Sequence, residues 1–380
     1  MHILIVGAGI AATALAAHLE QQGGWTVHLA GQPRRSDDAE GVVLWQNALR
    51  ILEDLQLLEP LESRARTADI WQLRNADDRV LNTVEFASED GMEDLLTMRR
   101  SDLLEVLCGG LDDAEIDRTA RVSGIEPEEE KTTVIFEDHR SEAYDLVVAA
   151  DGIDSTVRKL AFDGWTSETF DDVSIHLPIT AGDEAALDHP VQWFGQGGAS
   201  VVALPVAGAA AAHAVLPFNG EPNSVDAREL LRQQSGQFPT PIGRLFDQAH
   251  HRLVARPNRE VKVGNWYNER VLLIGDAAHG LHPLVGIGPT LALEDARLLY
   301  ELLADKAPDH LEVALRRFQA RRMTRLRRFR RLSYVTRKSV LTRSPLAASM
   351  RDFMISRSAK FAELLVSDVD PVGGGRRTPS

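Results

Sequence analysis

Residues 2–12 read HILIVGAGIAA, and this stretch decides the fold. The apolar run at residues 2–6 is typical of a strand that is buried on both faces, as in a parallel sheet. Two closely spaced glycines and an Ala- and Leu-rich helix follow, and residues 25–29 form a second apolar run. The order strand, glycine turn, helix, strand is the context in which a glycine motif indicates a dinucleotide site.

The turn GAGIAA is the G-x-G-x-x-A form of the dinucleotide fingerprint. Gly7 permits the tight turn, Gly9 lets a pyrophosphate approach the backbone, and Ala12 lets the helix pack closely on the strand. The helix N-terminus would add partial positive charge. The usual ribose-binding carboxylate at the end of the second strand is replaced by Leu29-Ala30-Gly31. We therefore predict a dinucleotide site with an altered ribose contact.

Composition narrows the class of protein. The 380 residues are 44% hydrophobic and 26% charged, which is typical of a folded globular chain and excludes a disordered one. The net charge of −14 argues against nucleic-acid binding, because a polyanion needs a basic surface. A single cysteine, Cys108, fits a reducing compartment, and we predict a cytoplasmic protein. Residues 189–220 lack charged side chains, but their prolines and glycines predict short strands rather than a membrane helix.

The rest of the chain is predicted to alternate between two sheets. Buried parallel strands are expected at residues 145–150 and 270–274, and helices from Gly41 and from Pro289. Residues 166–265 carry short strand-like runs and many turn residues, which favours an antiparallel layer. The predicted fold class is α/β: a Rossmann-like domain with a parallel sheet, interleaved with a mostly antiparallel substrate-binding sheet and followed by C-terminal helices.

The helix predicted after residue 310 is strongly basic and has only a thin apolar stripe. This pattern favours a helix that packs on the acidic body of the protein rather than one that binds an anionic partner.

The predicted fold divides the chain into interleaved parts. The predicted parts are a dinucleotide-binding domain (1–70, 97–165 and 266–305), a substrate-binding sheet layer (71–96 and 166–265), a C-terminal basic helix (306–340), and a C-terminal helix and tail (341–380) with a disordered end.

Three sequence blocks occur in a fixed order: GAGIAA at 7–12, DLVVAADGIDSTVR at 145–158, and RVLLIGDAAHGLHPLVGIGPTLALEDA at 270–296. With GVVLWQNALRILEDLQLL at 41–58 and RRSDLL at 99–104, they resemble the FAD-dependent aromatic hydroxylases, the p-hydroxybenzoate hydroxylase-like flavoprotein monooxygenases. The resemblance covers about residues 1–335. It implies FAD as the bound cofactor and NAD(P)H as a transient co-substrate, which agrees with the lack of a second nucleotide fingerprint.

The resemblance also implies roles for individual residues. It assigns Asp276 to the ribitol of FAD and places Arg100 beside the flavin. It assigns Asp151 and Arg158 to a block that serves both FAD and the nicotinamide cofactor. The remaining implied contacts form the loop that leads into the helix at residue 289, and they are Pro283, Gly286 and Gly288.

The flavin loop departs from the family pattern at two positions. The usual glutamine between the two loop glycines is Ile287, and the usual asparagine is Thr290. Both glycines are kept, so a close approach of the backbone to a flavin remains possible. Together with the missing ribose carboxylate, these changes leave open whether the cofactor is used for redox chemistry.

Substrate residues are predicted on the inserted sheet, which in the family covers the reactive face of the flavin. Gln192, Trp193 and His213 are the candidates, and His213 could deprotonate a phenol because an imidazole titrates near neutrality. A buried histidine without a catalytic role is the alternative for His213. His279 and His282 lack acidic or cysteine partners at metal-ligand spacing, so no metal site is predicted.

The predicted function is an FAD- and NAD(P)H-dependent monooxygenase that hydroxylates an aromatic or polyketide-like small molecule with O₂. By family analogy, the oxygen is transferred from a flavin C4a-hydroperoxide, and the protein contributes orientation, exclusion of water and electrostatics. The alternative is a cyclase, isomerase or hydrolase-like enzyme on the same scaffold, with FAD absent or structural. Neither reading predicts a nucleic-acid or membrane partner, and the oligomeric state stays open.

Overall fold

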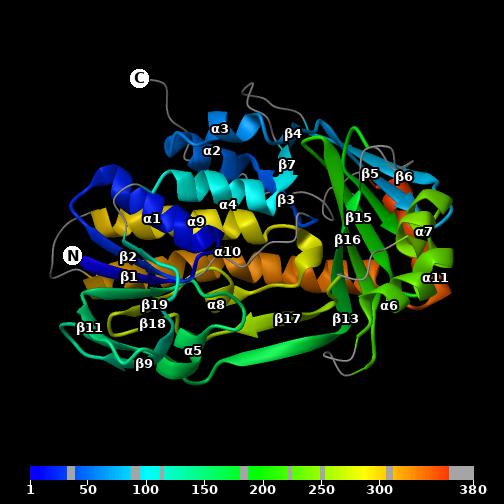
Figure 1. The fold of residues 1–380 in the computed structure, drawn as a ribbon. Coiled ribbons are helices and arrows are strands. Elements are labelled where there is room, and N and C mark those ends of the chain that lie inside the picture. Colours follow the sequence, from blue (N-terminus) through cyan, green and yellow to red (C-terminus); the bar gives the residue numbers. More distant parts are fainter. Residues whose placement is uncertain are drawn as a thin grey trace.

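The structure is a computed structural model that describes residues 1–31, 39–86, 95–111, 115–179, 187–220, 225–248, 253–304 and 311–358. Two large sheets lie at opposite ends of the molecule, and helices cover and connect them (Figure 1). The predicted disordered end of the chain falls outside the described residues.

The first large sheet has six strands and carries the dinucleotide fingerprint. Four of its five neighbouring pairs are parallel, as the all-apolar runs predict for strands buried on both faces. The antiparallel exception lies at one edge, between its first two strands. In spatial order the strands are β18 (Tyr267–Asn268), β19 (Val271–Leu273), β12 (Leu146–Ala149), β1 (His2–Val6), β2 (Thr26–Ala30) and β8 (Glu115–Asp117).

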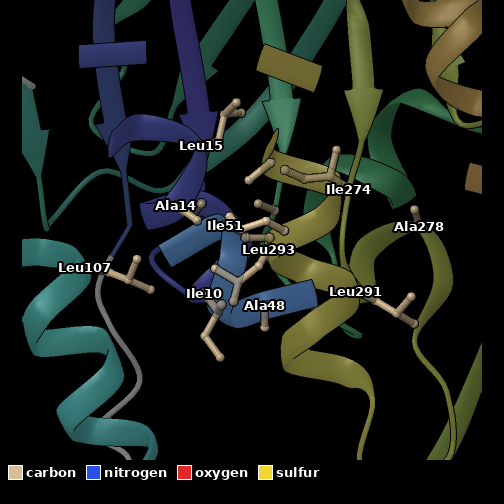
Figure 2. Close-up of a cluster of buried hydrophobic side chains, with 14 of the residues drawn as sticks. Ile10, Ala14, Leu15, Ala48, Ile51, Leu107, Ile274, Ala278, Leu291 and Leu293 are labelled. Atoms are coloured by element: carbon tan, nitrogen blue, oxygen red, sulfur yellow. The ribbon is translucent and has the colours of Figure 1, made fainter. Parts of the chain in front are cut away.

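Helices from four parts of the chain pack together beside this sheet (Figure 1). They are α1 (Ile10–Gln22), α2 (Gln46–Asp54), α4 (Arg100–Gly109) and α9 (Gly288–Ala304). Figure 2 shows where they meet: Ile10 and Ala14 of α1, Ile51 of α2 and Leu293 of α9 point into one apolar cluster. This packing fixes α1 and α9 relative to one another, so the positions of their N-termini are set by the core.

The second large sheet has seven strands and is antiparallel except between β14 and β5. Its strands come from two separate stretches of sequence. In spatial order they are β17 (Arg256–Lys262), β13 (Thr166–Ile179), β16 (Ala209–Pro217), β15 (Ser200–Val206), β14 (Val191–Phe194), β5 (Ile70–Asn75) and β6 (Val80–Glu85). The predicted short strands of residues 189–220 are thus confirmed, and among the described residues no helix is long and apolar enough to cross a membrane.

One predicted element is wrong. The helix expected from Gly41 begins only at Gln46, because residues Gly41–Trp45 form β3, which pairs antiparallel with β7 (Leu95–Arg99). Leu44 fits a helical spacing with Ala48, but it is buried as part of a strand whose last four residues are all buried. The sequence spacing alone does not distinguish these two ways of burying it.

Two small sheets and several short helices complete the body. One small sheet has the order β3, β7, β4 (Arg66–Thr67), with β7 in the middle. The other consists of β9 (Val122–Pro127), β10 (Thr132–Phe136) and β11 (Ser141–Tyr144). The remaining short helices are α3 (Leu58–Glu62), α5 (Thr156–Ala161), α6 (Ala227–Gln234), α7 (Thr240–Asp247) and α8 (Asp276–His279).

The basic helix α10 (Leu311–Val340) packs against α9 and leads to α11 (Pro345–Arg357). Its arginines meet acidic residues of the body: Arg322 and Arg325 pair with Glu294, and Arg337 pairs with Asp172. The basic face is therefore neutralised in part within the molecule. The predicted fold class is confirmed, whereas the division of the chain into domains remains a prediction.

Candidate active site

A pocket of about 330 Å³ lies between the two large sheets. Its walls come from the N-terminus of α1, the segment Gly275–Ala292, and strands of the seven-stranded sheet. A concave site of this size, whose wall combines apolar side chains with several polar and charged ones, is typical of small-molecule binding. Most of the predicted site residues line it.

The fingerprint turn brings the N-terminus of α1 to the pocket. Gly7 has φ +130°, and a Cβ there would lie 2.3 Å from the carbonyl oxygen of Ala150, so this position admits only glycine. Gly9, Ile10 and Ala11 line the pocket, while Ala12 is fully buried behind them. The unpaired N–H groups of a helix start and its dipole together suit a phosphate group.

A second glycine-containing loop also lines the pocket. Asp276, Pro283, Gly286 and Gly288 all line the pocket, and Gly288 begins α9. A Cβ added at Gly286 or at Gly288 would meet no protein atom within 4 Å. This backbone therefore borders open space, which a bound planar group can approach closely.

The two departures from the family pattern in this loop have different surroundings. Ile287 is 2% exposed and contributes an apolar surface to the pocket. Thr290 is fully buried in the first turn of α9, and the pocket is lined there by Pro289 and Leu291 instead. Neither change blocks the backbone N–H groups at the start of α9, so the loop keeps its capacity to face a flavin.

Arg100 lies at the start of α4 and lines the pocket next to the fingerprint turn. Its Nε is 3.4 Å from Oε1 of Glu40, and its Nη2 lies 3.8 Å from where a Cβ on Gly9 would be. The backbone N–H of Arg100 donates to the carbonyl of Glu40 at 2.8 Å. The guanidinium is thus held beside the predicted phosphate-binding turn.

Asp151 and Arg158 stabilise the Asp-Gly segment beside the site, and Arg158 also bonds to the Gly-Asp segment. Asp151 accepts hydrogen bonds from the backbone N–H groups of Thr156 and Val157, and burial raises the pKa of its carboxyl group. Arg158 is 1% exposed and donates to the carbonyl oxygens of Ala277 and Ile153. Arg158 therefore links the Asp-Gly and Gly-Asp segments, whereas Asp151 fixes the turn within the Asp-Gly segment. Their predicted contact with cofactors remains a prediction.

The seven-stranded sheet separates two of the predicted substrate residues. Gln192 lines the pocket and is 2% exposed, with its Nε2 3.3 Å from Oγ of Ser200. Trp193 lies on the opposite face, where it packs in a second apolar core and donates from Nε1 to Asp78 at 2.8 Å. Because successive side chains of a strand point to opposite faces, the structure does not bring Trp193 to the pocket.

His213 reaches the pocket from β16. It lies directly opposite His176 of β13, and the two rings stack with their centroids 4.6 Å apart. Burial, together with the charges of His176 and His282, lowers the pKa of His213 well below its ordinary value. A neutral imidazole at the pocket wall can accept a proton.

Sequence reasoning did not identify the partners of this histidine. His213 Nε2 is 2.8 Å from Oγ of Ser174, and Ser174 is bonded to Asn258. His279 and His282 each meet a carboxylate, Asp295 and Asp172 respectively. An alternation of polar and apolar residues at 172–177 is the sequence signal for the Ser174 face, but it does not reveal what that face meets.

The geometry defines a class: a dinucleotide-binding α/β protein whose nucleotide site opens into a pocket walled by a second sheet. Residues 1–328 match the family described as FAD binding domain, and the chain belongs to that family. It is an FAD-dependent monooxygenase of the aromatic hydroxylase type, as the sequence resemblance predicted.

Individual relatives agree with this assignment. A 3-amino-4-hydroxybenzoate 2-monooxygenase of Streptomyces platensis is 29% identical over 355 residues, 87% of this chain and 86% of its own length. A 2-heptyl-3-hydroxy-4(1H)-quinolone synthase of Pseudomonas aeruginosa is 27% identical over 93% of this chain and 94% of its own. Klebsiella pneumoniae HpxO, solved with FAD and uric acid, has the same fold, with a TM-score of 0.85, 19% identity, and 96% and 95% of the two chains covered.

The residues of this chain fit FAD. The two loop glycines leave open space where side chains would otherwise stand, and two long helices point their N-termini at the pocket. Asp276 lies at the pocket with an exposed carboxylate, which can accept hydrogen bonds from a polyol. These groups are suited to the pyrophosphate, the flavin ring and the ribitol.

Proposed function

We propose that this protein uses FAD, NAD(P)H and O₂ to hydroxylate a small aromatic substrate, or a polyketide-like one, that carries a ring hydroxyl group. The observation that carries the proposal is the shared pocket: the proposed flavin loop at Gly286–Gly288, which leads into α9, and the His213 imidazole of the seven-stranded sheet line the same cavity. When bound, FAD supplies the redox chemistry, and the side chains of the chain orient the reactants and move protons.

The cofactor contacts are proposed on the wall that holds the two helix starts. The N–H groups at Gly9–Ala11 face the pyrophosphate, Asp276 accepts from the ribitol, and Arg100 lies beside the flavin. The start of α9 at Gly288 faces the pyrimidine end of the flavin, where its dipole favours negative charge. Asp151 and Arg158 are proposed to support FAD and the nicotinamide cofactor by holding the neighbouring backbone.

The substrate is proposed to lie against Gln192 and His213. His213 accepts the proton of the substrate hydroxyl, and the electron pair that stays on oxygen enriches the ring carbon that receives the new oxygen atom. The step starts from a neutral imidazole, and burial keeps His213 neutral; because burial also disfavours the imidazolium that the step forms, His213 is a weaker base than an exposed histidine. Gln192 offers an amide at the same wall for orientation.

The relatives support an electron-rich ring as the substrate class. The monooxygenase names specify an amino-hydroxybenzoate and a hydroxynicotinate as the rings acted on, and the quinolone synthase is named for an alkylated hydroxyquinolone product. Each of these rings carries a hydroxyl or oxo group that can share its electron pair with the ring. The single cysteine of the chain supports a cytoplasmic place for the reaction.

The test is a purified protein with its absorbance spectrum, followed by coupled assays. We expect a flavin spectrum, NADH or NADPH oxidation stimulated by one member of a panel of hydroxylated aromatics, and a product heavier by one oxygen atom. With ¹⁸O₂ the new atom is labelled. His213→Gln is expected to keep the flavin and lose at least roughly hundredfold in kcat. A product that forms without O₂ and without NAD(P)H contradicts the proposal.

A further inference from the structure

A chain of buried hydrogen bonds leads away from His213 through the seven-stranded sheet. His213 Nε2 is 2.8 Å from Ser174 Oγ, and Ser174 Oγ is 2.7 Å from Asn258 Oδ1. Asn258 Nδ2 is in turn 2.7 Å from Oδ1 of Asp172. Ser174, Asn258 and Asp172 are each at most 5% exposed. Polar groups this deeply buried are retained only with their hydrogen bonds satisfied.

The chemistry of the groups fixes the direction of every bond in this chain. An ionised carboxylate only accepts, so Asn258 turns its NH₂ group to Asp172 and its carbonyl oxygen to Ser174. A carbonyl oxygen also only accepts, so the Ser174 hydroxyl donates its hydrogen bond to the Asn258 carbonyl oxygen. The Ser174 oxygen is then left as an acceptor toward His213. The Nε2 atom of His213 must therefore carry a proton.

Asp172 anchors the direction of the chain because it stays ionised. Burial alone would raise the pKa of Asp172, but hydrogen bonds from His282 and Asn258 and the charge of Arg337 lower it below its ordinary value. His282 Nε2 lies 2.8 Å from Oδ1, and Arg337 Nε lies 3.0 Å from Oδ2. Both carboxylate oxygens are thus occupied by donors, and neither needs a proton.

The chain of hydrogen bonds lies on one face of the sheet because successive side chains of a strand point to opposite faces. Asp172 and Ser174 of β13 share one face with His176, while Val173 and Ile175 point into the second apolar core. The titratable groups around His213 are His176, stacked on its ring, and His282, which also lines the pocket. Because Nε2 contacts Ser174 and the His213 side chain lines the pocket, Nδ1 is the ring nitrogen left for a molecule in the pocket.

We infer that Ser174, Asn258 and Asp172 are positioning residues that hold His213 as the Nε2–H tautomer, so that Nδ1 accepts the proton of the substrate hydroxyl. The inference rests on the proposed role of His213 as the base. In that step the O–H bond of the substrate breaks, an N–H bond forms at Nδ1, and the electron pair stays on the substrate oxygen. The resulting imidazolium keeps its Nε2–H bond to Ser174, with the Asp172 carboxylate at the far end of the chain.

The first measurement needs no turnover. In ¹⁵N-histidine-labelled protein, His213 is assigned by comparison with His213→Gln. We expect an N–H resonance at Nε2 and an unprotonated Nδ1 at neutral pH in the absence of substrate. In Ser174→Ala, the Nε2 proton is expected to exchange with water at least about tenfold faster, and Ser174→Thr is expected to restore the slow exchange. A proton at Nδ1 in the wild-type protein overturns the inference, even if the enzyme hydroxylates its substrate.

The second measurement separates a positioning role from a structural one. Ser174→Ala is expected to lower kcat about tenfold or more, with KM changed less than threefold, and to move the ionisation of the bound substrate hydroxyl to higher pH. Ser174→Thr is expected to recover most of the rate. Ser333→Ala, which removes another buried serine hydroxyl on α10, controls for a general loss of stability. An unchanged substrate ionisation in Ser174→Ala with full flavin content contradicts the inference, whereas a wild-type protein without any flavin-dependent product contradicts only the proposed function.

Discussion

The guanidinium of Arg322 donates to the carboxylate of Asp295 from a position 27 residues further along the chain. Asp295 is fully buried, and it also accepts from the backbone N–H of Gly275 and from Nε2 of His279, both at 2.7 Å. Gly275 and His279 bracket Asp276, the proposed ribitol contact. The basic helix α10 thus helps to fix the turn that presents Asp276. The positive charge of Arg322 therefore has a structural role inside the protein.

Asp295→Asn is therefore expected to damage both stability and FAD binding. Arg322 loses its fully buried carboxylate partner and keeps only Glu294, so we expect a loss of unfolding free energy somewhat below the about 3–5 kcal/mol of a completely broken buried ion pair. Urea unfolding and titration of the apoprotein with FAD measure the two effects. Arg321→Gln removes the neighbouring exposed arginine of α10 and is expected to change neither quantity. A loss below about 1 kcal/mol in Asp295→Asn would show that the pair is dispensable.

Two glycines of the cofactor site are expected to fail in different ways when they are replaced. Gly7→Ala places a Cβ 2.3 Å from the carbonyl oxygen of Ala150, so the fold itself should be lost or strongly destabilised. The Cβ of Gly288→Val would meet no protein atom within 4 Å, so we expect this variant to fold, but its side chain would fill space that a flavin needs.

The measurement for this pair compares thermal unfolding without FAD and flavin content after reconstitution. Gly288→Val should unfold within a few degrees of the wild-type apoprotein and bind no flavin. Ile287→Gln is the matched control, because it restores the residue usual in the family, and should keep both properties. If Gly288→Val binds flavin fully, the start of α9 is not part of the cofactor site.

The cofactor half of the site is predictable from sequence because its signals are local. Gly7 and Gly9 stand between a buried strand and a helix, and the block around Asp276 follows another buried strand. Short-range geometry of this kind determines where the backbone turns and which groups face the ligand. Gly9, Asp276 and the loop glycines of these blocks accordingly line one pocket, whereas Gly7 and Ala12 do not, and the contact of all of them with a cofactor stays a prediction.

The substrate half depends on contacts between distant residues, which the sequence does not display. Ser174 and Asn258 are 84 residues apart and meet only because β13 and β17 pair. Gln192 and Trp193 are neighbours that the pleat of the strand sends to opposite faces. Only the position of the strand in the sheet shows that Gln192, and not Trp193, faces the pocket. The strand at Gly41 was missed because its apolar residues also fit a helical spacing.

Buried His18 is expected to make stability fall in mild acid. Burial, and then the charge of Arg297, lowers the pKa of His18 from 6.5 to about 4. Since the folded-state pKa lies below the unfolded one, the unfolded chain takes up the proton first. The contribution to stability is therefore complete above about pH 6.5 and is lost as the pH falls toward about 4, up to roughly 3 kcal/mol in total.

His18→Phe tests this expectation and keeps the aromatic stacking on Tyr300, whose ring centroid is 5.2 Å away. Urea unfolding at a series of pH values between 7 and 4 should show a shallower loss of stability for the variant than for the wild type. His139→Asn, at an exposed turn with positive φ, serves as the control and should follow the wild-type curve. Parallel curves for His18→Phe and the wild type would mean that His18 gains access to water in the folded protein.

The last prediction uses the two faces of β14. Gln192→Met removes an amide from the pocket wall, and we expect KM for the aromatic substrate to rise about two- to tenfold, since a hydrogen bond contributes about 0.5–1.5 kcal/mol. Trp193→Phe removes the bond to Asp78 and part of a buried ring, so it should cost about 1–3 kcal/mol of unfolding free energy while KM stays unchanged. Steady-state kinetics and urea unfolding of both variants give the comparison. An equal change of KM in Trp193→Phe and Gln192→Met, at unchanged stability, would contradict this prediction. The second apolar core would then affect substrate binding, and the two faces of β14 would not have separate roles.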